Sequence, residues 1–354
     1  MSYHLPKLVL GEKNSELGSL FLLLLCGAAI FLNGCSAPPS RGQMLTFSGP
    51  MMGTEYRVSM VVEDVAMSSR IEQQVLAAMQ SVDQSMSTYR SDSELSQLNA
   101  APSNMPLDIS KPLAVVLHEA QRISRLSDGA FDVTLAQAID LWGFGPNGSI
   151  TQKPKEQLLA EIRDSVGYQK LVLGGRSIEK RQSGMSISLS AIAKGYAVDQ
   201  VANLLEEIGI SDYLVNIGGE LRASGHKDDG SNWKVGIEKP HILGGIQEIV
   251  LLQNKAIATS GDYRNYHVID GKQYSHTIDP KTLTPVFHRL ALVSVIDDSA
   301  MTADALATAM MAMGESAALQ FADQNGLTVF MIIRDGAEHQ YRLEVSDSFR
   351  GYLQ

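Results

Sequence analysis

The residues best suited to chemistry lie in an alanine-rich stretch, residues 300–308, which reads Ala-Met-Thr-Ala-Asp-Ala-Leu-Ala-Thr. Alanine is the strongest helix former, so this stretch is predicted to be helical. Asp304 and Thr308 are four residues apart and would share one helix face. A carboxylate and a hydroxyl, completed by backbone carbonyls, are hard oxygen ligands that suit Mg²⁺ beside a phosphate. The alternative is a buried helix in which the helix dipole favours Asp304 near the N-terminus and the Thr308 hydroxyl donates a hydrogen bond to a carbonyl of the preceding turn.

Several glycine-containing turns border segments that are expected to be strands. They are residues 52–54 (Met-Gly-Thr), 216–220 (Asn-Ile-Gly-Gly-Glu) and 258–262 (Ala-Thr-Ser-Gly-Asp). Glycine lets a ligand approach the backbone, where free amides can bond anionic oxygens. Lys194 stands at the start of a predicted helix, where the dipole does not favour a cation. It is therefore expected to face a negative partner, with a surface lysine as the alternative.

Two further segments place an acid or a base beside a turn. His276 and Asp279 lie at the end of an expected strand, and Phe131 and Asp132 follow a glycine turn. Other signatures do not occur: there is no Gly-x-x-x-x-Gly-Lys-Ser/Thr loop and no His-Glu-x-x-His. The one Gly-x-Gly-x-x-Gly, residues 143–148, follows a helical stretch instead of a strand, and we interpret it as a loop.

Composition limits the classes of function. The chain has 354 residues, of which 44% are hydrophobic and 19% charged, as is usual for globular proteins. Its net charge is −10 and it has no basic run, which argues against nucleic-acid binding. Its two cysteines, Cys26 and Cys35, lie in the N-terminal segment. No disulfide and no thiolate chemistry is therefore expected in the mature chain.

Residues 1–34 are predicted to be a lipoprotein signal peptide. Residues 20–32 form an apolar run that has the length of a signal h-region and is short for a membrane span. The run ends in Leu-Asn-Gly-Cys, which resembles a bacterial lipobox and would make Cys35 the lipid-bearing N-terminus. A plain secretory signal or a short anchor is the alternative. Residues 35–44 would be a lipidated tether, so we expect a protein anchored at the periplasmic face of a bacterial membrane, inner or outer.

Hydrophobic periodicity predicts both helices and strands along the rest of the chain. Clusters of strands without strict alternation with helices favour an α+β fold with mixed, mainly antiparallel sheets and packed helices. The expected helices are residues 71–86, 110–128, 154–166, 191–208 and 302–325. The expected strands are residues 54–62, 213–217, 233–238, 248–252, 256–260, 266–269, 273–278, 290–296, 328–334 and 341–345.

Taken together, these segments resemble the ApbE family of FAD:protein FMN transferases. The matching motifs, in chain order, are Met-Gly-Thr, Ser-Thr-Tyr, Ala-Phe-Asp, Ala-Ile-Ala-Lys-Gly-Tyr-Ala-x-Asp, Asn-Ile-Gly-Gly-Glu, Ala-Thr-Ser-Gly-Asp, His-x-Ile-Asp-Pro and Thr-Ala-Asp-Ala-Leu-Ala-Thr-Ala. Each motif is weak alone, but eight in order are specific. The resemblance implies one ApbE-like domain of T-fold-related architecture over residues 45–350.

The resemblance also implies a set of site residues, carried over motif by motif. FAD would be bound by Met52, Tyr89, Ala130, Phe131, Asp132, Ser188, Lys194 and Ile278. The metal ligands would be the side chains of Asp304 and Thr308 and the carbonyls of Ala191 and Ala307. The catalytic residues would be Asp304 and His276, and the sequence does not rank His276, Asp304 and Asp279 as the base.

This chain departs from the family pattern at two places. Ser188-Leu189-Ser190 stands where the family often has Asp-Leu-Gly, which removes a carboxylate near FAD. Leu283 stands where a glycine usually follows Asp-Pro-x-Thr. We expect the second change to affect only a turn.

The implied reaction is Mg²⁺-dependent transfer of the FMN moiety of FAD to a Thr or Ser hydroxyl of an acceptor protein, with release of AMP. Mg²⁺ would neutralise charge on the pyrophosphate as a Lewis acid and a template. The acceptors would be exported subunits of membrane redox complexes. Two alternatives remain open: a Mg²⁺-dependent FAD pyrophosphatase that yields FMN and AMP, and a non-catalytic periplasmic flavin-binding lipoprotein.

Overall fold

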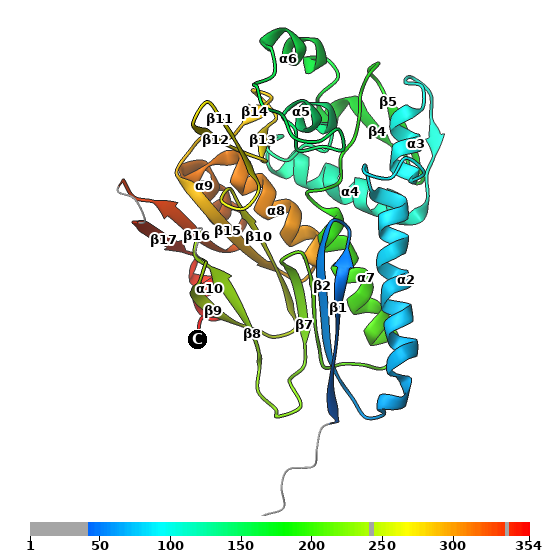
Figure 1. Ribbon diagram of the computed structural model, residues 1–354, viewed down its shortest axis with the longest axis vertical. Coiled ribbons are helices and arrows are strands. Elements are labelled where there is room, and N and C mark those ends of the chain that lie inside the picture. The colour runs from blue at the N-terminus through cyan, green and yellow to red at the C-terminus, as the bar shows by residue number, and fades with distance from the viewer. Residues whose placement is uncertain (1–41, 241–243, 337–339) are drawn as a thin grey trace, which may run out of the picture. The chain divides into compact units, whose positions relative to one another are not determined.

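An eight-stranded antiparallel sheet organises the fold (Figure 1). The computed structural model describes residues 42–240, 244–336 and 340–354, so the expected signal peptide 1–34 and Cys35 lie outside the described residues. In spatial order the strands are β1 (Gln43–Met51), β2 (Thr54–Val62), β6 (Tyr213–Ile217), β7 (Glu220–Ser224), β10 (Lys255–Gly261), β15 (Leu290–Asp297), β16 (Thr328–Arg334) and β17 (Tyr341–Val345).

Four smaller sheets and nine described helices complete the domain. One small sheet has three strands in the order β3 (Leu107–Asp108), β5 (Ser177–Lys180) and β4 (Leu171–Leu173). The other three are pairs: β8 (Trp233–Glu238) with β9 (Ile246–Leu252), β11 (Tyr266–Ile269) with β12 (Lys272–Ser275), and β13 (Ile278–Asp279) with β14 (Thr284–Pro285). The helices are α2 (Ser68–Met86), α3 (Glu94–Ala100), α4 (Lys111–Leu126), α5 (Ala136–Leu141), α6 (Glu156–Arg163), α7 (Ala193–Glu207), α8 (Ala300–Met313), α9 (Glu315–Asn325) and α10 (Asp347–Arg350). The predicted α+β class, with mainly antiparallel pairing, is confirmed.

The central strands of the large sheet are buried on both faces. In β15, Val293 and Val295 pack with the helices α2, α7 and α8 in one core. The alternate residues Leu292 and Ile296 pack with β8, β9 and α10 in a second core. This explains why β15 reads as a continuous apolar run instead of an alternating one.

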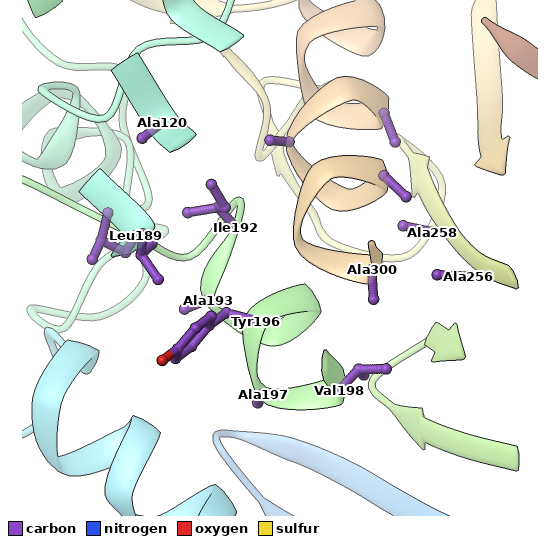
Figure 2. Close-up of a cluster of buried hydrophobic side chains, with 14 of the residues drawn as sticks. Ala120, Leu189, Ile192, Ala193, Tyr196, Ala197, Val198, Ala256, Ala258 and Ala300 are labelled. Atoms are coloured by element: carbon purple, nitrogen blue, oxygen red, sulfur yellow. The ribbon is translucent and has the colours of Figure 1, made fainter. Parts of the chain in front are cut away.

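Helices α7 and α8 approach each other closely because small side chains line their contact. Figure 2 shows Ala193, Ala197 and Ala300 in this region, with Ala256 and Ala258 of β10 opposite. At Gly195 even a Cβ would not fit, since it would lie 2.3 Å from the carbonyl oxygen of Ala300. The distance between the two helices therefore depends on glycine at this position.

Some element boundaries differ from the expected ones. The helix expected over residues 302–325 is two helices, because Gly314 separates α8 from α9 with a left-handed φ of 77°. The strand expected at 273–278 is divided between β12 and β13. Strand β1 was not among the expected strands; it begins at Gln43, within the expected tether. In the described ranges, no helix combines the length and apolar character needed to cross a membrane.

Leu283 does more than the sequence led us to expect. Its backbone has a left-handed φ of 60°, which is unfavourable for a branched side chain. The side chain is nevertheless buried in a core with Ile278 and Trp142. The indole Nε1 of Trp142 also donates to the Leu283 carbonyl at 2.9 Å. The expectation that this change affects only a turn is wrong, since the leucine fills a core that a glycine would leave open.

Gly195→Ala is expected to destabilise the protein. The added methyl would meet helix backbone and not a movable side chain, so separating α7 from α8 should cost about 2–3 kcal/mol of unfolding free energy. Chemical denaturation measures this cost. Gly175→Ala is the matched control, because no atom lies within 4 Å of its added Cβ, and a change there within about 0.5 kcal/mol is expected. Equal stability of the two variants would contradict the close contact.

Leu283→Gly is expected to lower stability despite relieving an unfavourable backbone conformation. Relief of the left-handed φ should contribute about 1 kcal/mol, while the loss of the buried side chain should cost about 2–5 kcal/mol. Thermal or chemical unfolding measures the net effect. Asn104→Gly is the control, since Asn104 has a φ of 61° and is exposed. A more stable Leu283→Gly protein would show that the side chain adds nothing to its core.

Candidate functional site

The carboxylate of Asp304 is held at the contact between α7 and α8. Its Oδ2 accepts a hydrogen bond from the backbone N–H of Gly195 at 3.0 Å. The same glycine that allows the helices to approach therefore also donates to the carboxylate. Asp304 is only 4% exposed, so its position is determined by the packing around it.

A second acidic residue fixes the start of α8. Asp199 of α7 accepts hydrogen bonds from the Ser299 hydroxyl at 2.7 Å and from the amides of Ala300 and Met301 at 3.0 Å each. These are among the amides that have no partner inside the helix, and an anion is favoured at this end. Arg222 of β7 pairs with Asp199 at 3.2 Å. Asp199 is thus a positioning residue for the helix that carries Asp304.

Lys194, Glu220 and Asp304 form a charged cluster inside the fold. Nζ of Lys194 lies 3.0 Å from Oε1 of Glu220 and 3.9 Å from Oδ2 of Asp304. Both carboxylates are 4% exposed, and the Lys194 side chain is 28% exposed. The prediction that Lys194 faces a negative partner is confirmed. Two carboxylates and one ammonium leave an excess of negative charge at this place.

Burial and mutual charge shift the protonation of this cluster. Burial raises the pKa of Glu220 to about 7, although the Lys194 ammonium acts against this, and the charge of Asp304 adds to it. Burial also raises the pKa of Asp304, opposed by Lys194 and by the Gly195 amide. For Lys194, burial lowers the pKa, but the charges of Asp304 and Glu220 hold it above its usual value. Lys194 is therefore a stable cation.

Glu220 is held in the cluster by the tight turn between β6 and β7. Ile217 pairs with Glu220, so Gly218 and Gly219 form a two-residue turn, with φ values of 67° and 104°. A Cβ on Gly218 would lie 3.2 Å from Cδ of Lys194, so the turn also packs against the lysine stem. Sequence reasoning treated this turn as an anion-binding loop and missed the glutamate. The feature of the sequence that could have indicated Glu220 is the position of an acidic residue directly after the two glycines.

Of the expected metal ligands, Ala307 and Thr308 lie on α8 with Asp304. Thr308 is one helical turn further along α8, and its Oγ1 is 3.4 Å from Oγ of Ser260. The Gly195 amide, which would close the first turn of α7 onto Ala191, is instead bonded to Asp304. Ala307 is buried in α8. No group of three or more His, Cys, Asp or Glu residues within the described ranges could hold a metal ion.

The chemistry of these donors fits a hard cation. The expected set contains one carboxylate, one hydroxyl and two carbonyls, which are oxygen ligands of the kind Mg²⁺ takes alongside substrate phosphates. Such a set holds a single acidic side chain, so it contains no cluster of three acidic or imidazole ligands. The excess negative charge of Asp304 and Glu220 over Lys194 also suits a cation.

His276 has the properties of a base. Its Nδ1 lies 3.1 Å from the Asn265 carbonyl, and its ring meets the edge of Phe144. Burial lowers the pKa of His276 below its usual value, and the positive charge of Lys194 acts in the same direction. A neutral imidazole results. Asp279 is less suited, because its oxygens accept from the Lys281 amide at 2.9 Å and the Thr282 hydroxyl at 3.1 Å.

Two of the residues expected to bind flavin lie at accessible or strained positions. Met52 occupies the turn between β1 and β2 with a left-handed φ of 52°, a conformation that costs a non-glycine residue on the order of 1 kcal/mol. Tyr89 is 68% exposed and donates its hydroxyl to the Phe144 carbonyl at 3.0 Å. That bond brings Tyr89 and the segment next to His276 together.

The remaining expected flavin residues are engaged within the protein. Phe131 and Ile278 are buried in two different cores. Asp132 accepts from the Thr134 amide and hydroxyl and from the Tyr168 amide, and burial raises its pKa. The hydroxyl of Ser188 lies 3.1 Å from that of Ser190.

Ala130 is half-buried beside this group. The structure thus brings Lys194 and Asp304 together and places Thr308 one helical turn further along α8. A cavity of about 560 Å³ lies elsewhere, over α4, and none of the expected site residues line it.

This chain is similar to known proteins in sequence and in fold. Residues 52–331 match the ApbE family. The chain is 39% identical to the FAD:protein FMN transferase of Vibrio cholerae serotype O1, over 94% of this chain and 98% of that protein. It is 34% identical to the protein of the same name from Escherichia coli K12, over 93% of this chain and 96% of that protein.

Two solved structures are also similar. One is the flavin transferase ApbE from Vibrio cholerae, with a TM-score of 0.82 and 39% identity, covering 88% of this chain and 99% of that chain. The other is the apo form of the Pseudomonas stutzeri flavinyl transferase ApbE, with a TM-score of 0.80 and 37% identity, covering 88% of this chain and 96% of that chain. By sequence and by fold, this protein belongs to the ApbE family.

Proposed function

We propose that this protein transfers the FMN moiety of FAD to a Thr or Ser hydroxyl of an acceptor protein and releases AMP. The buried Lys194–Glu220–Asp304 cluster carries the proposal, because it concentrates charges that a simple flavin carrier would not need. The names of the similar proteins from Vibrio cholerae and Escherichia coli support flavin transfer as the class of reaction.

Asp304 and Lys194 of this cluster have proposed roles in binding FAD and its metal ion. Asp304 and Thr308, with the carbonyls of Ala191 and Ala307, would hold Mg²⁺. When bound, the ion supplies neutralising charge and Lewis acidity at the pyrophosphate of FAD. Lys194, which remains protonated, would contact the flavin nucleotide and offset charge on its phosphate oxygens.

The chemical step needs a base for the attacking hydroxyl. His276 would accept the proton of the acceptor Thr or Ser as its oxygen bonds to the phosphorus of the FMN phosphate. The bond from that phosphorus to the bridging oxygen breaks, and AMP leaves with this oxygen. The neutral state of His276 favours it over Asp279, whose carboxylate is engaged in its own turn.

The N-terminal segment supplies the proposed location. Cleavage before Cys35 and lipidation of its thiol would attach the enzyme to the periplasmic face of a membrane. Attachment would raise the rate of encounter with acceptor subunits of membrane redox complexes, because both partners are confined to one surface.

Asp304→Asn is expected to abolish transfer while the protein stays folded. The substitution keeps the shape of the side chain but removes its charge, so transfer should fall by on the order of 10²–10³-fold. Mass spectrometry of a Thr-containing acceptor peptide, incubated with enzyme, FAD and Mg²⁺, measures the gain of one FMN. Asp323→Asn, an exposed position on α9, is the control. Full transfer by Asp304→Asn would refute the role, and free FMN without labelled peptide would indicate a pyrophosphatase.

The pH dependence of transfer tests His276. Because its pKa is lowered, the imidazole stays neutral in mildly acidic solution, and kcat/KM should fall only below about pH 6.5. His276→Gln should lower kcat by on the order of 10²–10⁴-fold and remove this acidic decline. His118→Gln, on α4, should keep the wild-type profile. An acidic decline in His276→Gln with the same midpoint as in the wild type would assign the base to another group.

A further inference from the structure

One oxygen of Glu220 has no hydrogen-bond partner. Oε1 receives the Lys194 ammonium at 3.0 Å, whereas Oε2 is buried and unpaired among the described residues. Burying an unpaired carboxylate oxygen is costly, so a native protein retains one where a ligand or a second state of the protein uses it. The residue itself is 4% exposed, so bulk water does not supply that partner.

The position of Lys194 suggests what that second state is. Its ammonium sits between two carboxylates but lies 0.9 Å closer to Glu220 than to Asp304, at 3.0 Å and 3.9 Å. A divalent cation on Asp304 would place a like charge a few ångströms from this ammonium. Repulsion would move the ammonium towards the other carboxylate, where Oε2 is free to accept it.

We propose that Glu220 is an unassigned positioning residue of the site, which holds the Lys194 ammonium away from Asp304 so that a divalent cation can bind there. This inference rests on the proposed function, in which Asp304 is a cation ligand. Without Glu220, the ammonium would have Asp304 as its only anionic partner in the cluster and would compete with the cation for it.

The rigidity of the surrounding backbone supports this role. Glu220 begins β7 directly after the two-glycine turn, and Gly218 packs against the Lys194 stem. The backbone of Glu220 is therefore fixed by the pairing of β6 with β7, and its side chain is packed at 4% exposure. Lys194, with a flexible stem, is the member of the pair that can move.

Mn²⁺ titration of the full-length protein in the absence of flavin tests the proposal, with free Mn²⁺ measured by electron paramagnetic resonance. Glu220→Gln should weaken Mn²⁺ binding by on the order of tenfold. Glu220→Asp, which keeps the charge, should recover most of the affinity, and Lys194→Met should bind Mn²⁺ more tightly than wild type. Glu206→Gln is the matched control, since this carboxylate pairs with Arg222 instead.

The decisive comparison is Glu220→Gln made in the Lys194→Met background. If Glu220 acts through Lys194, its effect should shrink to less than about threefold there. A loss of affinity that persists without the lysine would make Glu220 a direct cation ligand and overturn the proposal, as would unchanged binding in Glu220→Gln alone. In the double variant both side chains are uncharged, so no lysine ammonium is left buried without its glutamate. The comparison can therefore be made even if Glu220→Gln alone fails to fold.

Failure of the proposed function would look different. Wild-type protein would then bind no Mn²⁺ saturably, or Asp304→Asn would bind it as wild type does. Either result would remove the cation site itself and the inference with it. A different pair of results would reject only the role of Glu220. In that case wild-type protein binds Mn²⁺ and Asp304→Asn does not, but Glu220→Gln binds it as wild type does, so the proposed function remains.

Discussion

The close contact between α7 and α8 is the constraint on which the site depends. Gly195 allows the Ala300 carbonyl to approach, and its amide bonds the Asp304 carboxylate. Asp199, one turn further along α7, binds the first amides of α8. The two helices are thus connected at both ends of one short interface, and the Asp304 carboxylate cannot shift without moving the helices. Alanines in the adjoining core keep the remaining distance small (Figure 2).

The acidic and basic side chains within this packed region are unequal in number. A buried ion pair recovers its desolvation cost only when partners and hydrogen bonds satisfy each group. Here Lys194 is the ion-pair partner of two carboxylates, and Oε2 of Glu220 has no hydrogen-bond partner. The raised pKa values of both acids express the same imbalance. Oε2 of Glu220 therefore remains a buried acceptor that no described residue fills.

Local pattern predicted much of the fold, and contacts distant in sequence account for what was missed. The alternation of apolar and polar residues was sufficient to predict β2. The capping serine was sufficient to predict the start of α4, where Ser110 accepts a hydrogen bond from the Leu113 amide. The break at Gly314 was missed because alanine continues the helical pattern through it. Glu220 and Leu283 could not be assigned from pattern. The role of each depends on a partner from another part of the chain, Lys194 for the first and Trp142 for the second.

Within the described ranges, strand β1 lies at one edge of the large sheet and pairs only with β2 (Figure 1). An exposed edge strand invites pairing with a second molecule, which natural proteins prevent with proline, charges or short strands. Pro50 interrupts β1 with a residue that lacks an N–H group, and at the opposite edge β17 carries Arg342 and Glu344. Both edges of the sheet therefore resist pairing with the sheet of a second molecule.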